Sequence, residues 1–183
     1  MDLITAIEGR RSAGKLGEPG PDAAQLERLL RAAASAPDHG RLSPWRFVVM
    51  EGAARGVLGD AMANLLLRRH PDATPEALQT ERAKALRAPL LVAVAARTVA
   101  AHKVPEIEQV AAVAAAVQNL LLAARALGFG SMWKTGAPAY DAGVKSALGL
   151  EPSDAIVGFV YLGTTLAPGK PREVTLDGAV RRL

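Results

Sequence analysis

The stretch that decides the fold reads EIEQVAAVAAAVQNLLLAARAL and runs from Glu106 to Leu127. Its central part, Val110–Leu122, is apolar nearly all round, with only Gln118 and Asn119 as polar residues. This pattern predicts a long helix that must be covered on most of its sides. A chain of 183 residues leaves little material for that cover, so we expect a second copy of the chain to share it in a symmetric homodimer.

The same stretch is the strongest candidate for a membrane span, and we expect it not to be one. The apolar run Val110–Leu122 is short and is flanked by Glu108 and Arg125, whereas a spanning helix needs about 20 predominantly apolar residues. The N-terminal residues Met1–Glu8 carry acid early and lack the basic and apolar regions of a secretory signal. We therefore expect a soluble protein in the cytoplasm, with no membrane partner.

Shorter elements lie on both sides of the long helix. Asp22 is a suitable N-cap for a helix whose Leu26, Leu29, Leu30 and Ala33 share one face. Further helices are expected at residues 3–10, 53–69, 75–86 and 140–148, and strands at residues 45–50, 90–95, 130–133 and 156–162. Together with abundant alanine and few aromatic residues, this pattern predicts one helix-rich α+β or α/β domain over residues 1–183.

Composition excludes several kinds of chemistry. The absence of cysteine rules out disulfides, thiolate metal sites, iron–sulfur clusters and cysteine nucleophiles. The net charge of +4 and the isoelectric point of ≈ 9.8 would suit nucleic acid. However, the basic residues are dispersed in pairs such as Arg10-Arg11 and Arg68-Arg69, without the basic stripe and stacking aromatics of a nucleic-acid surface. We expect no nucleic-acid partner.

The first block that could carry chemistry is Arg10-Arg11-Ser12, at the end of the first predicted helix. Two guanidinium groups and a hydroxyl suit the fixed charge of a phosphate monoester. Cations at a helix C-terminus are also favoured by the helix dipole without any ligand. Taken alone, the block is better explained by the helix dipole than by a ligand.

The second block is the polar loop Ser35–Phe47, which contains two prolines and leads directly into a predicted strand. Loops of this kind on a rigid scaffold often build binding sites. His39 fits a ligand contact as well as an imidazole that only bonds the neighbouring backbone. Trp45 is better explained as a core anchor at the start of the strand.

The third block is Ala126–Gly136, which consists of a helix end, a glycine turn, a strand and a second glycine. Its glycines allow a close approach of the backbone, and Lys134 and Thr135 can serve a phosphate or a ring oxygen. It is not a dinucleotide fingerprint, because Trp133 fills the place of the third glycine and the motif leaves a helix instead of opening one. The chain has no G-x-S-x-G elbow and no Walker A loop, and His102 lacks a second ligand at metal-binding spacing.

Taken together and in this order, the three blocks resemble the nitroreductase family of FMN-dependent enzymes, and in particular its compact YdjA-like subgroup. The resemblance covers almost the whole chain. Its segments are Arg10-Arg11-Ser12, Ala36-Pro37-Asp38-His39 leading to Pro44-Trp45-Arg46-Phe47, His102-Lys103-Val104-Pro105 with Glu108-Gln109, Gly128-Phe129-Gly130 through Trp133, and Gly158-Phe159-Val160-Tyr161-Leu162-Gly163.

The resemblance implies a fold and a set of cofactor contacts. The fold would be α+β, with a mainly antiparallel central sheet flanked by helices, in an intertwined homodimer that holds FMN in each of two interface crevices. The cofactor contacts implied are Arg10, Arg11 and Ser12 from one subunit, Ser35 and His39 from the other, and Trp133, Lys134 and Thr135 to complete the site.

The resemblance also implies an activity. Hydride from NADH or NADPH would reach the flavin N5, and a small oxidised compound such as a nitroaromatic or a quinone would then take the electrons in a ping-pong mechanism. No catalytic side chain is expected, since the flavin supplies the chemistry.

Two departures from the family pattern leave an alternative open. Many members carry a basic residue two positions after the serine, where this chain has Gly14 and its Lys15 is one residue out of phase. The usual asparagine and glutamine of the loop before the tryptophan fall on Arg41 and Ser43. The missing base near the flavin ring gives some weight to a flavin carrier or sensor with little turnover.

Overall fold

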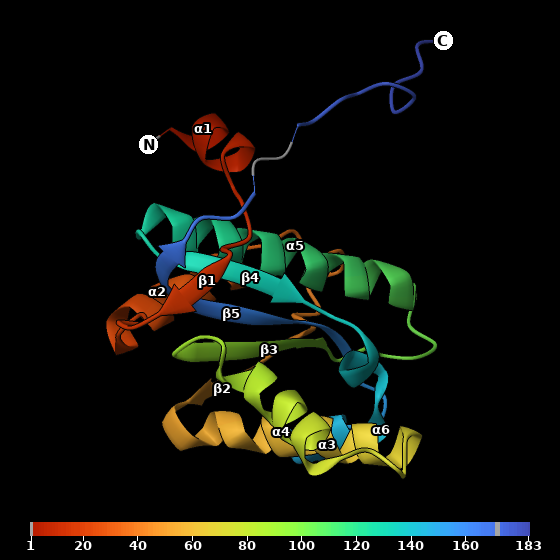
Figure 1. Ribbon diagram of the computed structural model, residues 1–183. Coiled ribbons are helices and arrows are strands. Elements are labelled where there is room, and N and C mark those ends of the chain that lie inside the picture. Colours follow the sequence, from red (N-terminus) through yellow and green to blue (C-terminus); the bar gives the residue numbers. More distant parts are fainter. Residues whose placement is uncertain (1, 171–172) are drawn as a thin grey trace.

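The computed structural model describes residues 2–170 and 173–183, and its elements form three layers (Figure 1). The helices are α1 (Leu3–Glu8), α2 (Ala23–Ala34), α3 (Arg55–Arg69), α4 (Pro75–Ala83), α5 (Glu106–Ala126) and α6 (Ala142–Ala147). The strands are β1 (Lys15–Gly17), β2 (Trp45–Glu51), β3 (Leu90–Ala96), β4 (Gly130–Lys134) and β5 (Ala155–Ala167). Short 3-10 turns, η1 (Gly52–Ala54), η2 (Lys84–Leu86) and η3 (Ala137–Tyr140), adjoin α3, α4 and α6.

The sheet is antiparallel in each of its pairings. Its order is β1-β5-β3-β2, and β4 also pairs with β5. The long strand β5 therefore holds the sheet together, because β3, β4 and β1 all bond to it. In the register, Val160 of β5 lies opposite Val92 of β3 and Trp133 of β4. The predicted α+β class with a mainly antiparallel sheet is confirmed.

Alternate residues of β3 build two separate cores. Val92 and Val94 pack beneath α2 and α5, whereas Leu91 and Ala93 pack against α3 and α6 on the other face. Successive strand side chains point to opposite faces, so a strand buried on both must be apolar throughout. The sequence LLVAVAA meets this requirement, and all seven residues are buried.

The helix α5 covers one face of the sheet but leaves part of its own surface open. Val113, Val117 and Leu120 are fully buried, while Ile107 is 73% exposed and Ala111 is also exposed. By length and composition α5 is long and apolar enough to cross a membrane, so the expectation that the run is too short was wrong: the helix extends well beyond it at both ends. Its apolar window is 44% buried inside the chain, as fits a core helix that packs against the sheet and α2.

Several boundaries differ from the sequence prediction. The strand β1 was not predicted, because its three residues show no alternation and pair only with the distal end of β5. The helix α1 ends at Glu8 instead of Arg10, since Gly9 forms its C-cap. The helix expected at residues 140–148 divides into η3 and α6, where Asp141 caps α6 by accepting a hydrogen bond from Val144 N at 2.9 Å.

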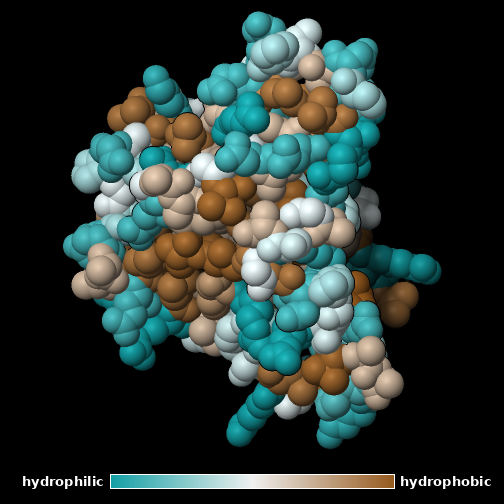
Figure 2. All heavy atoms as spheres, turned by 90° about the horizontal axis from the view of Figure 1, so that it is seen from below, coloured by the Kyte–Doolittle hydropathy of each residue, from teal (hydrophilic) through white to brown (hydrophobic). Residues whose placement is uncertain are grey.

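Apolar surface remains exposed at the chain ends. Leu3 and Ile4 of α1 are 67% and 61% exposed, and the tail that extends away from the body in Figure 1 exposes Val174 and Leu176. The face seen in Figure 2, on the side of α3 and α4, mixes apolar patches with hydrophilic side chains. Exposed apolar side chains gathered on a helix and a tail are typical of surfaces that pack against another chain.

Candidate functional site

The segment that follows α1 is held over the sheet by backbone hydrogen bonds. Ala13 N donates to Ser131 O and Gly14 N donates to Ala167 O, both at 2.9 Å. A Cβ at Gly14 would lie 2.9 Å from Pro168 O, so a larger residue would have to displace the tail backbone. The close packing of the tail on this segment is a local reason for glycine at this position.

Arg10 and Ser12 line a hollow of ≈ 380 Å³. The other residues that line it are Gln118 and Leu121 of α5, Trp133 of β4, and Thr135, which follows β4. The structure thus brings Arg10, Ser12, Trp133 and Thr135 around one space, as the resemblance implied. Gln118 was not singled out, although a glutamine within the apolar run of α5 is the signal that could have found it.

The two adjacent arginines have different surroundings. Nη1 of Arg11 donates to the carbonyl oxygens of Glu8 at 2.5 Å and of Arg10 at 2.9 Å. Arg11 therefore serves the C-terminus of α1, where a cation is favoured. Among the described residues, the guanidinium of Arg10 forms no hydrogen bond or ion pair, which leaves its donors available to a ligand.

Three guanidinium groups line a second, smaller hollow of ≈ 180 Å³ that adjoins the first through Arg10. Arg10, Arg11 and Arg125 lie around it with Ser131 and Thr165. The Nε of Arg125 is buried and has no hydrogen-bond partner among the described residues. This concentration of positive charge suits an anion such as a phosphate. No group of three or more His, Cys, Asp or Glu that could hold a metal occurs in the part of the chain described.

Trp133 is positioned by a glycine on the neighbouring strand. Its Nε1 donates to Val157 O at 3.2 Å, and a Cβ at Gly158 would lie 2.5 Å from its Cδ1 and collide with its Nε1. The indole can therefore lie across β5 only because residue 158 has no side chain. This dependence was missed, although Gly158 belongs to the segments that carry the resemblance.

Strand alternation separates Lys134 from its two neighbours. Trp133 packs with the α5 core, and Met132 packs with the core beneath α3. Lys134 accordingly lines a different hollow, on the α3 side, and Thr135 at the end of β4 lines both. The structure does not bring Lys134 into the hollow that Arg10 lines.

Ser35 ends α2, beside Ala32, whose carbonyl oxygen also accepts from Asn119 of α5 at 3.3 Å. His39 lies in the loop that follows, near the N-terminal end of α5. The Ser35 hydroxyl donates to Ala32 O at 2.8 Å, and Nδ1 of His39 lies 2.5 Å from Oε2 of Glu108. Glu108 is ten to thirteen residues from Gln118 and Leu121, so His39 and the Arg10 hollow are separated by about 15–20 Å along α5. Within one chain the predicted contacts therefore form two groups: those that line the Arg10 hollow, and Ser35 with His39, of which only His39 lies at the far end of this helix.

A buried glutamine fixes the loop before α5. The side chain of Gln109 is 1% exposed, accepts from Val99 N at 2.8 Å and donates to Val104 O at 2.9 Å. These bonds anchor the chain that enters α5 and thereby the position of Glu108 beneath His39. The residues His102–Gln109 of the resemblance thus act largely as a support.

Comparison with known proteins agrees with this architecture. The model of the "Nitroreductase family" matches residues 7–164. The "Putative NAD(P)H nitroreductase YdjA" of Escherichia coli (strain K12) is 39% identical over 164 residues, which cover 90% of this chain and 88% of the relative. A nitroreductase-like family protein from Bacillus cereus has a crystal structure with a TM-score of 0.82 at 24% identity, covering 100% of this chain and 96% of that one.

A second solved structure, a nitroreductase with bound FMN from Bacteroides fragilis, has a TM-score of 0.76 at 22% identity. The match covers 100% of this chain and 99% of that one. The order of the elements, the antiparallel sheet and the extent of the family match all agree. The chain therefore belongs to the nitroreductase family.

Proposed function

We propose that this protein is an FMN-dependent oxidoreductase that takes electrons from NADH or NADPH and passes them to a small oxidised compound such as a nitroaromatic or a quinone. The observation that carries the proposal is the hollow lined by Arg10, Ser12, Trp133 and Thr135, in a chain of the nitroreductase family. The name of the Escherichia coli relative specifies NAD(P)H, and the Bacteroides fragilis structure contains FMN.

The two adjoining hollows fit the two parts of FMN. The space of ≈ 180 Å³ among Arg10, Arg11 and Arg125 offers charge for the phosphate. The space of ≈ 380 Å³ beside Trp133 and Thr135 offers a flat indole and a hydroxyl for the rest of the molecule. Arg10 lines both hollows and has free donors, so it is the residue suited to a charge-assisted hydrogen bond with the phosphate.

The chain's own side chains bind and orient in this proposal, while the bound flavin supplies the redox chemistry at its N5. Arg10 and Arg125 would hold the phosphate end, and Ser12, Trp133 and Thr135 would border the remainder. Arg11 keeps α1 in place through its carbonyl contacts, which fixes the direction in which Arg10 leaves the helix. Lys134 contributes charge to the neighbourhood from the other side of β4.

A symmetric homodimer would unite the two groups of predicted contacts. The open side of α5 carries Ile107, Ala111 and Ala114, which are at least partly exposed in the single chain. A two-fold axis crossing α5 near Ala114 makes the two helices antiparallel and sets the Glu108 end of one opposite the Leu121 end of the other. Ser35 and His39 of one subunit would then approach the Arg10 hollow of its partner.

In this dimer both half-reactions use one crevice. The nicotinamide must leave before the acceptor enters, which gives the ping-pong order. The exposed His39, with its carboxylate partner Glu108, would stand at the edge of the crevice and contact the isoalloxazine or the occupant above it.

The purified protein provides the first test. We expect flavin absorption bands, either as isolated or after addition of FMN, and oxidation of NADH or NADPH that depends on a nitro compound or a quinone. A flavin carrier would show the bands without turnover. Absence of the bands even with added FMN would contradict the proposal.

A further inference from the structure

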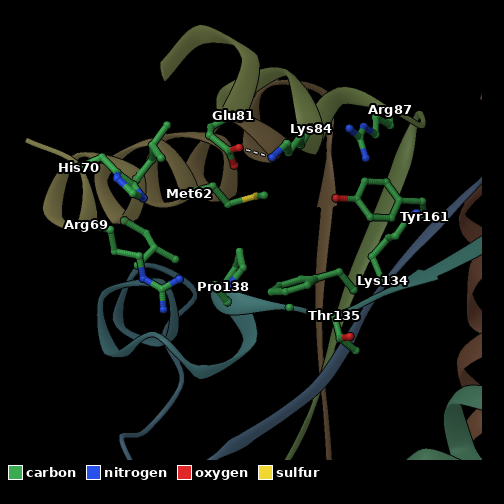
Figure 3. Close-up of a pocket in the computed structure, with 15 residues that line it drawn as sticks. Met62, Arg69, His70, Glu81, Lys84, Arg87, Lys134, Thr135, Pro138 and Tyr161 are labelled. Carbon is green, nitrogen blue, oxygen red and sulfur yellow. Dashed lines mark hydrogen bonds and ion pairs between the residues drawn. The ribbon is translucent and has the colours of Figure 1, made fainter. Parts of the chain in front are cut away.

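A second cavity, on the opposite side of β4 from the Arg10 hollow, has the properties of a ligand site. It measures ≈ 530 Å³, within the range of about 300–1,000 Å³ that is usual for small-molecule pockets. Its walls come from α3, the segment from α4 to Arg87, the end of β4 with η3, and the middle of β5 (Figure 3). Thr135 is the residue that it shares with the Arg10 hollow.

The interior of this cavity is apolar. Met62 and Leu65 of α3 and Phe159 and Tyr161 of β5 are buried and line it. Met62, Phe159 and Tyr161 belong to the core beneath α3, so the cavity is an open extension of that core. A flat hydrocarbon body of about two fused rings would replace water at this apolar wall.

The margin of the cavity is strongly cationic. Arg69, Lys84, Arg87 and Lys134 line it against the single carboxylate of Glu81. Lys84 forms an ion pair with Glu81, and within residues 2–170 and 173–183 Arg69, Arg87 and Lys134 form none. Four cations around one carboxylate repel one another, and an anionic ligand would relieve that repulsion.

A hydrogen-bond donor lies between the apolar and cationic parts. The Tyr161 hydroxyl points into the cavity, with Lys84 and Arg87 on one side and Arg69 on the opposite side (Figure 3). Burial raises the pKa of Tyr161, although the charge of Arg87 opposes that change. The phenol is therefore protonated at neutral pH and can donate to a carboxylate oxygen.

We infer that this cavity binds a small aromatic carboxylate, with its rings against Met62 and Phe159 and its carboxylate between Arg87 and the Tyr161 hydroxyl. An apolar wall requires a hydrocarbon body, and the unpaired cations require a negative charge at one end of it. The inference does not depend on flavin, because Met62, Phe159, Arg87 and Tyr161 do not line the Arg10 hollow.

The test uses the full chain as purified, labelled at the methionine methyl groups, with 2-naphthoate as the probe. Met62 lines the cavity, whereas Met50 and Met132 pack in the core and serve as references. Saturable displacement of the Met62 methyl resonance, assigned with Met62→Leu, is the expected result. An unmoved Met62 resonance at millimolar probe would overturn the inference.

Matched variants test the role of charge. Arg87→Gln should weaken 2-naphthoate by roughly 2- to 10-fold, because a rim cation is partly screened by water. Arg31→Gln removes the same charge on α2, away from the cavity, and should leave the affinity unchanged. The neutral analogue 2-naphthalenemethanol should also bind more weakly. Equal affinity of the two probes, or an equal loss in both variants, would reject the carboxylate site.

Discussion

The two faces of the sheet are covered to different degrees within one chain. On the α3 face, Leu58 is fully buried, and ion pairs of Arg82 with Asp60 at 2.8 Å and of Arg68 with Asp141 at 2.7 Å join α3 to its neighbours. On the α5 face, the outer helix keeps Ile107 73% exposed. We call the α3 face the complete face, because ion pairs within one chain join its helices, although Val57, Leu67 and Leu86 stay partly exposed there. We call the α5 face the incomplete face. The proposed cofactor crevice belongs to the incomplete face.

Truncation in the complete face should have the largest effect on stability. Leu58→Ala removes a fully buried side chain and should lower the free energy of unfolding by about 2–5 kcal/mol. Val57→Ala, on the same helix at a position 47% exposed, should cost less than about 0.5 kcal/mol. Denaturant unfolding of the two variants measures the difference. Similar losses in both would mean that the α3 face is not packed as described.

A charge on the incomplete face should instead affect assembly. Ala114→Arg places a cation at the centre of the open side of α5 and should weaken the proposed dimer about 100-fold or more, since an unpaired charge would be buried. FMN should be lost together with the dimer. Light scattering at several concentrations, with flavin absorbance recorded on the same samples, would follow both changes.

The matched control for that variant is Ala83→Arg, at an exposed alanine of α4. It adds the same charge on the complete face and should leave the size of the particle unchanged. A wild-type protein that is a stable monomer and still retains FMN would refute the link between assembly and cofactor binding.

The adjacent arginines allow a comparison within the incomplete face. Arg10→Ala should raise the FMN dissociation constant by roughly 10- to 150-fold, the equivalent of losing one hydrogen bond to a charged group. Arg11→Ala removes the contacts with the α1 carbonyls and should cost about 0.3–1 kcal/mol of stability with little change in FMN affinity. An FMN titration beside a thermal melt separates these effects. The opposite assignment would follow if Arg11→Ala weakened FMN more.

The smallest expected effect concerns the pair of Arg68 and Asp141. Burial alone would raise the pKa of Asp141. Hydrogen bonds from Arg68 and from the backbone of Val144 outweigh burial, so the pKa lies below its usual value. The charged carboxylate therefore stabilises the fold above its unfolded pKa of about 4. This contribution is lost as the pH falls through the lower folded value.

Asp141→Ala also removes the N-cap of α6 and should cost about 1 kcal/mol at pH 7. The difference in unfolding free energy from the wild type should shrink at pH 3 and below. Urea unfolding across this range provides the measurement, and a difference that is constant with pH would assign the whole effect to packing.

Elements with a strong pattern could be predicted from the sequence. The apolar run gave α5 to within a residue of its C-terminal end, and Asp22 was identified as the cap of α2, where it forms a capping box with Gln25. The strand β1 could not be predicted, because its three residues are ordered by pairing with a partner almost 150 positions away. The local sequence pattern carries no information about so distant a partner strand.

For the candidate site, the sequence singled out several residues that line one hollow, but it did not give the directions of their side chains. Arg11 turns back to the helix and Arg10 does not, because α1 ends at Glu8. A periodic sequence pattern does not determine where a helix ends. Strand alternation, by contrast, could have separated Lys134 from Trp133 and Thr135, but the three were predicted to share one site. The cofactor roles of all the predicted residues stay predictions, and those of Ser35 and His39 depend in addition on a second chain.

The hydrogen bond from Gly14 to Ala167 also bears on the order in which the molecule forms during synthesis. The Arg10 segment is synthesised well before the strand end that holds it. Until β5 emerges from the ribosome, the Arg10 segment lacks the hydrogen bond from Gly14 to Ala167. Because domains consolidate only when such long-range contacts can close, the nascent chain cannot complete the proposed cofactor hollow before β5 has been made.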